Sequence, residues 1–320
     1  MRKSGCLCGV FAALVLACSS AQAAWPERAV TLVVPFPPGG ITDTLARITA
    51  ERLQTTLKQP FVVENRPGGA GVIATERVAQ STPDGYTLLV GTVSQISISP
   101  FTHTIKFDPI RDFKPISIIA ISPFVIIVPK DLPVSTLKEF VDYAKSKPDR
   151  LNFGSAGVGA LSHFASEMFV RRAELKMTHV PYRGGALALS DLLGGNIQML
   201  SASPIEIQQY IGSGQIKLLG ISSAERSPKM PDVPAIAEFY PGHSAITWNG
   251  LLAPAGTPQE IIDKLSTEMQ AAQQDPEFRE RLEKLGVTPV RHTPADFAKV
   301  IADDMAHWRV VVEQIGLKAQ

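Results

Sequence analysis

Short runs of β-branched and other apolar residues alternate with segments of helical periodicity along most of the chain. Residues 29–34 form such a run, and apolar residues at helical spacing follow over 45–57, after a loop rich in proline and glycine. The same order of strand, loop and helix recurs at 61–80 and at 151–172. Strands that are apolar on both faces and joined by helices are typical of sheets covered on both sides. The sequence therefore predicts an α/β fold with mixed, mostly parallel sheets flanked by helices.

The composition excludes two classes of protein. Of the 320 residues, 45% are apolar and 19% are charged, which excludes a disordered chain and provides for one large core or two smaller ones. The net charge of +1 creates no positive field that would attract nucleic acid. The chain is predicted to fold and to bind no nucleic acid.

The first residues of the chain have the pattern of a secretory signal. All three cysteines lie there: Cys6, Cys8 and Cys18. Arg2 and Lys3 precede an apolar stretch at 9–17, which is too short to span a membrane, and Ala21-Gln22-Ala23 forms a cleavage site between small residues. Residues 1–23 are therefore predicted to be a cleaved signal peptide, and the mature chain is predicted to contain no cysteine.

A lipoprotein signal is the alternative interpretation of the same segment. Residues 15–18 loosely resemble a lipobox ending at Cys18, although the bulky Leu16 is unusual there. Soluble secretion fits the pattern better than lipid anchoring at Cys18.

The chain is predicted to form two lobes joined by two crossings. Apolar runs at 116–121 and 124–128 are separated by Pro123, and a later run at 246–253 has the character of a strand that returns to the first lobe. This divides the chain into a signal peptide, a first lobe and a second lobe: 1–23, then 24–123 with 248–320, then 124–247. A cleft between two such lobes is a common site for small ligands.

The first candidate ligand loop is Pro35 to Asp43, which joins the carboxyl end of a predicted strand to a helix. Unpaired N–H groups at the helix start and flexible glycines favour an anion such as a carboxylate or phosphate. No lysine follows Gly40, so a Walker loop is absent. A tight turn capped by Thr42 or Asp43 is the alternative. The candidate binding residues here are Phe36, Pro38, Gly39, Gly40, Thr42 and Asp43.

The second candidate ligand loop, at 154–163, has the same strand-to-helix character. Its candidate binding residues are Ser155, Gly157, Gly159, Ser162 and His163. It comes close to the nucleophile pattern Gly-x-Ser-x-Gly, but Phe153 stands in place of the first glycine, which leaves a serine hydrolase as the weaker alternative. Tyr182 offers a hydroxyl at another strand end, and Thr92 and Ser201 complete the candidate set. The six histidines show no metal-ligand spacing, so no metal site is predicted. No cofactor and no catalytic residue is predicted either.

Several motifs together resemble one known family. They are Trp25 to Arg28, the loop at 35–43, Val63 to Gly71, Pro83 to Leu89, the loop at 155–163, Thr178 to Gly184 and Gly250 to Pro258. This set looks like the Bug family, extracytoplasmic solute-binding receptors of the tripartite tricarboxylate transporter type. The resemblance covers almost the whole mature chain.

The resemblance implies a type II periplasmic-binding-protein fold, in which two lobes close on a small carboxylate. In the family, the loops after the first strand of each lobe hold the carboxylate, which corresponds to 36–43 and 155–163 here. The chain departs from the family pattern at Ala160, where threonine is usual, at Leu200 to Ser203, and at Asn249, where an aromatic residue is common.

The function implied by the resemblance is a monomeric periplasmic receptor that binds a small carboxylate and works with the permease subunits of a membrane transporter. Two alternatives remain open from the sequence: a receptor that presents its ligand to a sensor kinase without transport, and a secreted serine hydrolase using Ser155 or Ser162.

Overall fold

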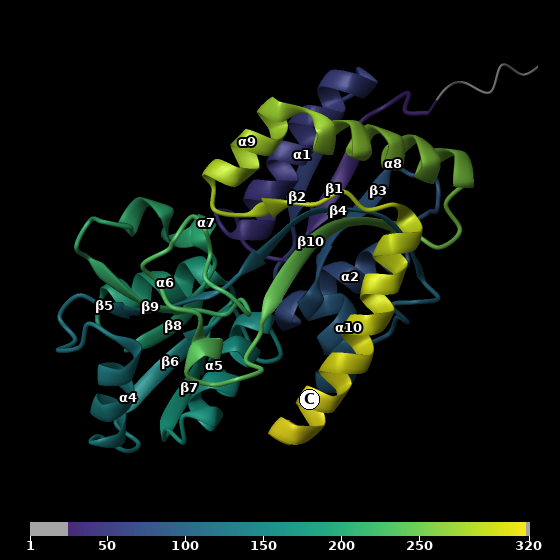
Figure 1. The fold of residues 1–320 in the computed structure, drawn as a ribbon. Helices are drawn as coiled ribbons and strands as arrows, with labels where there is room; N and C mark the ends of the chain where they lie inside the picture. Colours follow the sequence, from purple (N-terminus) through teal and green to yellow (C-terminus); the bar gives the residue numbers. More distant parts are fainter. Residues whose placement is uncertain (1–24, 318–320) are drawn as a thin grey trace, which may run out of the picture.

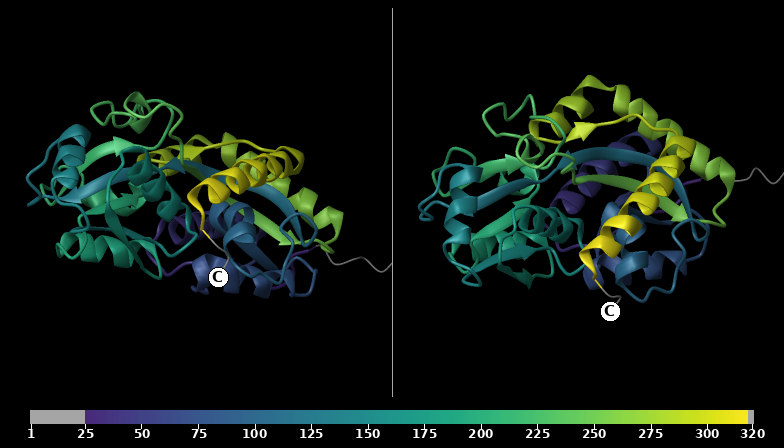
Figure 2. Two further views of the ribbon diagram at one scale, coloured as in Figure 1. Left: turned by 90° about the horizontal axis from the view of Figure 1, so that it is seen from below. Right: turned by 60° about the horizontal axis from the view of Figure 1, so that its bottom comes forward.

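Two β-sheets flanked by helices form two lobes that lie side by side in every view (Figure 1 and Figure 2). The structure is a computed structural model, and it describes residues 25–317. The predicted signal peptide at 1–23 and Cys18 lie outside the described residues. Within residues 25–317, no helix is both long enough and apolar enough to cross a membrane.

The first sheet has the strand order β11-β4-β10-β3-β1-β2. Its strands are β1 (Val30–Val34), β2 (Phe61–Asn65), β3 (Thr87–Thr92), β4 (Phe113–Pro123), β10 (Ile246–Pro254) and β11 (Thr288–Pro289). The pairings give β1 to β4 one direction, while β10 and β11 run the opposite way. The late strand β10 therefore inserts between β3 and β4 of the first sheet.

The second sheet has the strand order β7-β6-β8-β5-β9. Its strands are β5 (Val125–Pro129), β6 (Leu151–Ser155), β7 (Met177–Pro181), β8 (Met199–Ala202) and β9 (Ile216–Ile221). Only β5 runs against its neighbours β8 and β9 among these five strands. Both sheets are thus mixed, with most strands of each sheet running in one direction, and the predicted α/β class is confirmed.

Helices cover both faces of each sheet (Figure 1). Those of the first lobe are α1 (Ile41–Leu57), α2 (Val72–Ala79), α3 (Ser99–Thr102), α8 (Gln259–Gln274), α9 (Pro276–Lys284) and α10 (Pro294–Ile315). Those of the second lobe are α4 (Leu137–Lys145), α5 (Leu161–Arg172), α6 (Gly185–Leu193) and α7 (Pro204–Ile207). The described chain also has four short 3-10 or π-helical segments: η1 (Gly69–Gly71), η2 (Ser94–Ile98), η3 (Gln208–Tyr210) and η4 (Ile236–Glu238).

Alternation along β1 shows how the first sheet is buried on both sides. Leu32 packs into a cluster with residues of α1, α8 and α9, whereas the next residue, Val33, packs with residues of α2 and α10 on the other face. Neighbouring side chains of a strand point to opposite faces, so a run without polar residues is needed when both faces are covered. This is why residues 29–34 are apolar except for the half-buried Thr31.

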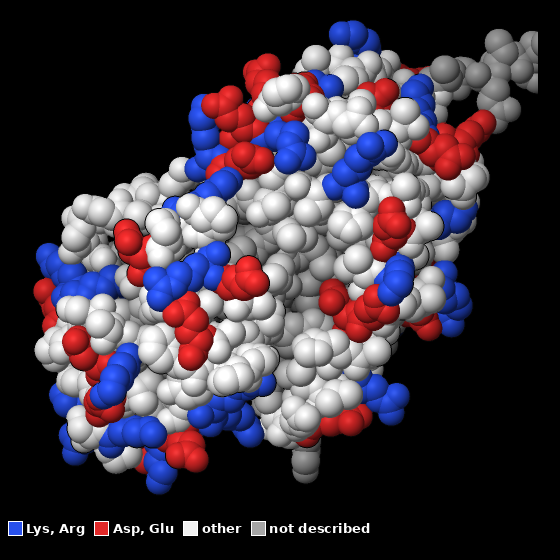
Figure 3. All heavy atoms as spheres, in the orientation of Figure 1, with Lys and Arg blue, Asp and Glu red and all other residues white. Residues whose placement is uncertain are grey.

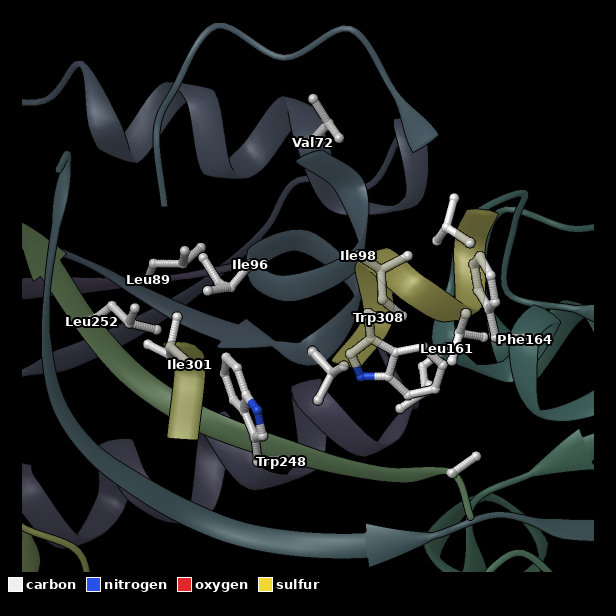
Figure 4. Close-up of a cluster of buried hydrophobic side chains, with 14 of the residues drawn as sticks. Val72, Leu89, Ile96, Ile98, Leu161, Phe164, Trp248, Leu252, Ile301 and Trp308 are labelled. Atoms are coloured by element: carbon white, nitrogen blue, oxygen red, sulfur yellow. The ribbon is translucent and has the colours of Figure 1, made fainter. Parts of the chain in front are cut away.

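The second face of the first sheet also carries the packing between the lobes. Trp248 and Ile301 lie near Leu252 in this cluster, and Leu161 and Phe164 reach it from α5 of the second lobe (Figure 4). Burial of each such side chain contributes about 1.5–3 kcal/mol to the stability of the fold. One apolar cluster therefore joins the two lobes beside the start of α5.

Candidate functional site

A cavity of about 60 Å³ lies between the lobes, with room for several water molecules. Both sheets contribute to its walls, mainly through strand ends and helix starts. The residues that line it are Phe36, Pro37, Gly40, Ile41, Thr42, Thr92, Ser94, Phe124, Ala156, Ala160, Leu161, Ser162, Gly184, Gly185, Ala186, Leu187, Leu200, Ser201, Ala202, Glu206 and Thr247. Of the residues predicted from sequence, Phe36, Gly40, Thr42, Thr92, Ser162 and Ser201 thus meet at one cavity.

Three helices begin at the cavity wall with an N-cap residue that provides no side-chain cap. The residues at the N-caps of α1, α5 and α6 are Gly40, Ala160 and Gly184, and none of them accepts a hydrogen bond from its helix through a side chain. By contrast, Thr293 caps α10 with its hydroxyl and Asp275 caps α9 with its carboxylate. Uncapped helix starts present backbone N–H donors and positive partial charge, so the cavity is built to receive an acceptor or an anion.

Serine hydroxyls add further donors to the cavity. The Ser162 Oγ accepts a hydrogen bond from the Ala156 N–H at 3.0 Å, and the Ser201 Oγ accepts one from the Ser166 hydroxyl at 2.9 Å. A hydroxyl that already accepts one bond still has its own proton to donate. These two lining hydroxyls are therefore oriented as donors, whereas Thr92 already donates to the Gln95 Oε1 at 2.7 Å.

Ser94 connects the two lobes at the cavity wall. It lies at the start of η2, and its Oγ accepts a hydrogen bond of 3.0 Å from the backbone N–H of Leu161, the first residue of α5. The sequence interpretation missed Ser94 because the segment 94–102 has no strand or helix periodicity. Its structure depends on packing against α10, which lies far away in the sequence.

Asp43 lies behind the first loop, outside the cavity lining. Its carboxylate accepts hydrogen bonds from the Gly39 N–H at 3.0 Å and from the Asn65 amide at 2.9 Å, and it pairs with Arg47 one turn later. Burial alone would raise the pKa of Asp43, but the hydrogen bonds from Arg47, Gly39 and Asn65 together hold that pKa below its usual value. Asp43 therefore shapes the turn that brings Gly40 to the cavity, and Pro38 and Gly39 lie in that turn.

A stacked pair of histidines supports the second loop. The rings of His163 and His179 lie 3.8 Å apart between centroids, with an angle of 9° between their planes. The His163 Nδ1 accepts a hydrogen bond from the Gly159 N–H, and the His179 Nε2 lies 2.6 Å from the Ser155 Oγ. Burial lowers the pKa of His163 to about 4 and that of His179 to about 3. Both rings are therefore neutral at pH 7.

Ser155 contributes to this support and does not line the cavity. Its side chain is fully buried, and its Oγ bonds both to His179 and to the backbone of Gly157. A serine without access to the cavity has no route to a substrate carbonyl, even though it lies beside a histidine. The Ser155–His179 contact therefore orders the loop.

Tyr182 lies at a second hollow, of about 220 Å³, with Phe36 and Gly157. Its hydroxyl donates to the Asp191 Oδ2 at 2.6 Å, and burial together with Asp191 raises the pKa of Tyr182 to about 12. Gly159 lies at a close contact between the lobes: a Cβ at this position would lie 2.6 Å from the His103 Cε1.

Glu206 is another polar cavity residue that was not predicted from the sequence. It is the only ionisable side chain among the described residues that line the cavity. The pattern Ser203-Pro204-x-Glu206 after a strand is the signal that would have placed it, because it predicts a capping box at a helix start.

Trp248 lies in the core rather than in the cavity wall. Its indole N–H donates to the Asp304 Oδ2 at 2.6 Å, and its ring packs edge-on against Phe297 of α10. Asn249 is fully buried and likewise does not line the cavity.

The outer surface contributes no strong field toward the cavity. Figure 3 shows Lys and Arg side chains interspersed with Asp and Glu over one face of the molecule. Many of them form ion pairs, such as Arg226 with Glu238 at 2.7 Å. Any preference of the cavity for an anion therefore arises from local donors and helix starts. Within residues 25–317, no group of three His, Cys, Asp or Glu side chains forms a metal-binding cluster.

Comparison with known proteins gives matches over nearly the whole chain. Residues 45–317 match the tripartite tricarboxylate transporter family receptor. BugT of Bordetella pertussis is 35% identical over 300 residues, which cover 92% of this chain and 91% of BugT.

Two solved structures from Rhodopseudomonas palustris share the fold. Rpa4515, solved with adipate, has a TM-score of 0.90 at 34% identity and covers 92% of this chain and 100% of its own. MatC, solved with bound malate, has a TM-score of 0.85 at 33% identity and covers 90% of this chain and 100% of its own.

Proposed function

Because the chain belongs to the family of tripartite tricarboxylate transporter receptors, we propose that its interlobe cavity captures a small carboxylate and delivers it to a membrane transporter. Family membership makes the chain a solute-binding receptor rather than an enzyme, which removes the alternative of a secreted serine hydrolase. The resemblance to the Bug family and the two-lobed periplasmic-binding fold that it implied are confirmed.

The convergence of three uncapped helix starts on one cavity is the observation that supports a carboxylate ligand most strongly. Two carboxylate oxygens can accept several hydrogen bonds at once, so they can satisfy the N–H groups that remain free at these helix starts, where, within residues 25–317, only the Leu161 N–H donates to a side chain, that of Ser94. Among the described residues, no Lys, Arg or His lines the cavity. The adipate and malate bound by two relatives are carboxylates and support the same class of ligand.

We assign different roles to the residues predicted from the sequence. Those that line the cavity are proposed to contact the ligand: Phe36, Gly40, Thr42, Thr92, Ser162 and Ser201. Those that lie behind it are proposed to position the two loops: Pro38, Gly39, Asp43, Ser155, Gly157, Gly159 and His163. Tyr182 is proposed to stand at the mouth of the cleft, where the second hollow lies.

Delivery requires export and a change between open and closed lobes. We propose that residues 1–23 are a cleaved signal peptide and that the mature receptor acts as a monomer in the periplasm. Its lobes, 24–123 with 248–320 and 124–247, are proposed to hinge about the crossings near Pro123 and Trp248. The closed form would then be recognised by permease subunits in the membrane.

Mass spectrometry of the solute released on denaturing the purified mature receptor tests this function. We expect a small molecule with at least one carboxyl group, and we expect a shift of the thermal unfolding temperature when that molecule is added back. A stoichiometric solute without a carboxyl group would overturn the proposal. So would the absence of any shift across a panel of dicarboxylates, tricarboxylates, aromatic carboxylates and acidic amino acids.

A further inference from the structure

The carboxyl group of Glu206 is held by one oxygen and turns the other toward the cavity. Its Oε2 accepts hydrogen bonds from the Ser203 N–H at 3.0 Å and from the Ser203 hydroxyl at 2.9 Å, which closes the capping box of α7. No residue within 25–317 makes a hydrogen bond to Oε1. The capping box therefore fixes the side chain and leaves one acceptor atom available to a ligand.

Two glycines make room for this acceptor. A Cβ at Gly40 would lie 3.6 Å from the Oε1 of Glu206, and a Cβ at Gly185 would overlap with it. Gly185 has no positive φ, so its backbone does not require glycine. The space occupied by the carboxyl group of Glu206 is what excludes a side chain there. The Oε1 atom thus lies between the starts of α1 in one lobe and α6 in the other.

Within the described part of the chain, the cavity wall offers the carboxyl group of Glu206 no cationic side chain. Most of the other residues that line the cavity are apolar, among them Phe36, Phe124, Leu187 and Leu200. Burial raises the pKa of Glu206, and the hydrogen bonds from Ser203 oppose that rise. A carboxyl oxygen without a hydrogen-bond partner in a mostly apolar wall gains most from a ligand that donates a hydrogen bond to it, above all from a cation.

We propose that Glu206 determines ligand specificity, by selecting small carboxylates that also carry an amine or hydroxyl donor and by rejecting a second carboxylate at that point. This inference rests on the proposed function, since the helix starts must hold the ligand's own carboxylate. Discrimination then arises both from the bond that the donor makes and from the repulsion that a second carboxylate meets.

Calorimetric titration of the mature receptor with four-carbon acids of matched size tests the proposal. The probes are butyrate, succinate, and butyrates with an amino or hydroxyl group at the α or the ω carbon. We expect at least one donor-bearing acid to bind at least about tenfold more tightly than butyrate and succinate. Tighter binding of succinate accompanied by proton uptake would overturn the proposal, because Glu206 would then act as a protonated donor.

The variant Glu206→Gln replaces the acceptor atom that faces the cavity with a hydrogen-bond donor and keeps the capping box. Its amide oxygen can still accept from Ser203, and its NH₂ group then faces the cavity as a donor. We expect the preference for donor-bearing acids to disappear and the affinity for succinate to rise about tenfold relative to them. Gly185→Ala, which displaces the Glu206 carboxyl group, should also abolish the preference.

Asp296→Asn is the matched control, because Asp296 has the same capping-box role with Thr293 at the exposed start of α10. It should leave every affinity unchanged. If carboxylates bind and Glu206→Gln leaves their relative affinities unchanged, the Glu206 inference fails and the proposed function stands. If no carboxylate binds to the unmodified receptor, both fail.

Discussion

Phe164 of α5 packs edge-on against Trp308 of α10, with ring centroids 5.7 Å apart and an angle of 66° between the ring planes. The two residues come from different lobes, and the contact lies close to the start of α5, where Leu161 donates its N–H to Ser94 of the other lobe. Aromatic contacts of this geometry contribute about 0.5–1.5 kcal/mol beyond the burial of their surface. The contact therefore helps to fix the position of the first turn of α5 beside the cavity.

Phe164→Ala should weaken both stability and ligand binding. Loss of a fully buried phenylalanine costs about 3–5 kcal/mol of unfolding free energy, and here it also frees the start of α5. Phe169→Ala is the matched control, because Phe169 is equally buried but packs against Phe140 inside the second lobe. Urea denaturation should show a loss of stability in both variants, and calorimetry should show weaker binding in Phe164→Ala alone. Equal affinities in the two variants would contradict this role.

Ser162→Ala should reduce the affinity for the carboxylate without unfolding the receptor. The hydroxyl lines the cavity and has its proton available because its oxygen accepts from Ala156. Hydrogen bonds to charged groups are worth about 1.5–3 kcal/mol, so the affinity should fall about ten- to a hundredfold. Ser190→Ala on the exposed face of α6 provides the control, since its hydroxyl bonds only to the backbone of Ala186. Unchanged binding in Ser162→Ala would exclude this hydroxyl from the site.

Gly159→Ala should open the cleft, whereas Gly195→Ala should not. Both glycines have positive φ, +80° and +78°, so an alanine at either position costs about 1–2 kcal/mol of backbone strain. Only at Gly159 would the added Cβ meet the other lobe, 2.6 Å from the His103 Cε1. Small-angle scattering with ligand should show a more open form for Gly159→Ala alone, together with weaker binding. Identical scattering profiles and affinities for the two variants would contradict a close approach at this point.

Stability should fall as the pH is lowered from about 6.5 toward 4. His163 and His179 have pKa values of about 4 and about 3 in the fold, below the usual value of 6.5. Between these values the unfolded chain binds more protons than the folded one, so their stabilisation is complete above pH 6.5 and is lost on acidification. His243, with a pKa of about 4, acts in the same direction.

Asp304 acts in the opposite direction, because burial raises its pKa to about 6 and its contribution is lost as the pH rises through that value. Denaturation at pH 5 and pH 7 measures the sum of these effects, and His163→Phe should remove a dependence equivalent to about one proton. A pH dependence that is the same in His163→Phe and in the unmodified receptor would show that His163 is not a buried neutral ring.

The main elements of the fold could be predicted because local sequence signals and tertiary packing agree. The run at 29–34 forms β1, and the strand, loop and helix expected at 151–172 form β6, the second candidate ligand loop and α5. The loop at 35–43 could be identified as a candidate ligand loop because glycines between a strand and a helix allow a ligand to approach the backbone closely.

The features that escaped prediction depend on contacts between distant segments. Ser94 reaches the cavity only because η2 packs under α10, and Glu206 reaches it only because Gly185 lacks a side chain. Trp248 could be assigned to the core only once Phe297 and Asp304 of α10 were placed beside it. No pattern within one segment specifies such neighbours.

Calorimetric titration with a carboxylate and its primary carboxamide tests most directly whether the donors around the interlobe cavity bind a carboxylate. The two compounds have nearly the same shape, but only the carboxylate offers two negatively charged acceptor oxygens to the starts of α1, α5 and α6. We expect that a carboxylate released from the purified receptor binds at one molecule per chain, and that its carboxamide binds at least about a hundredfold more weakly. Equal affinities for the two compounds would contradict this expectation.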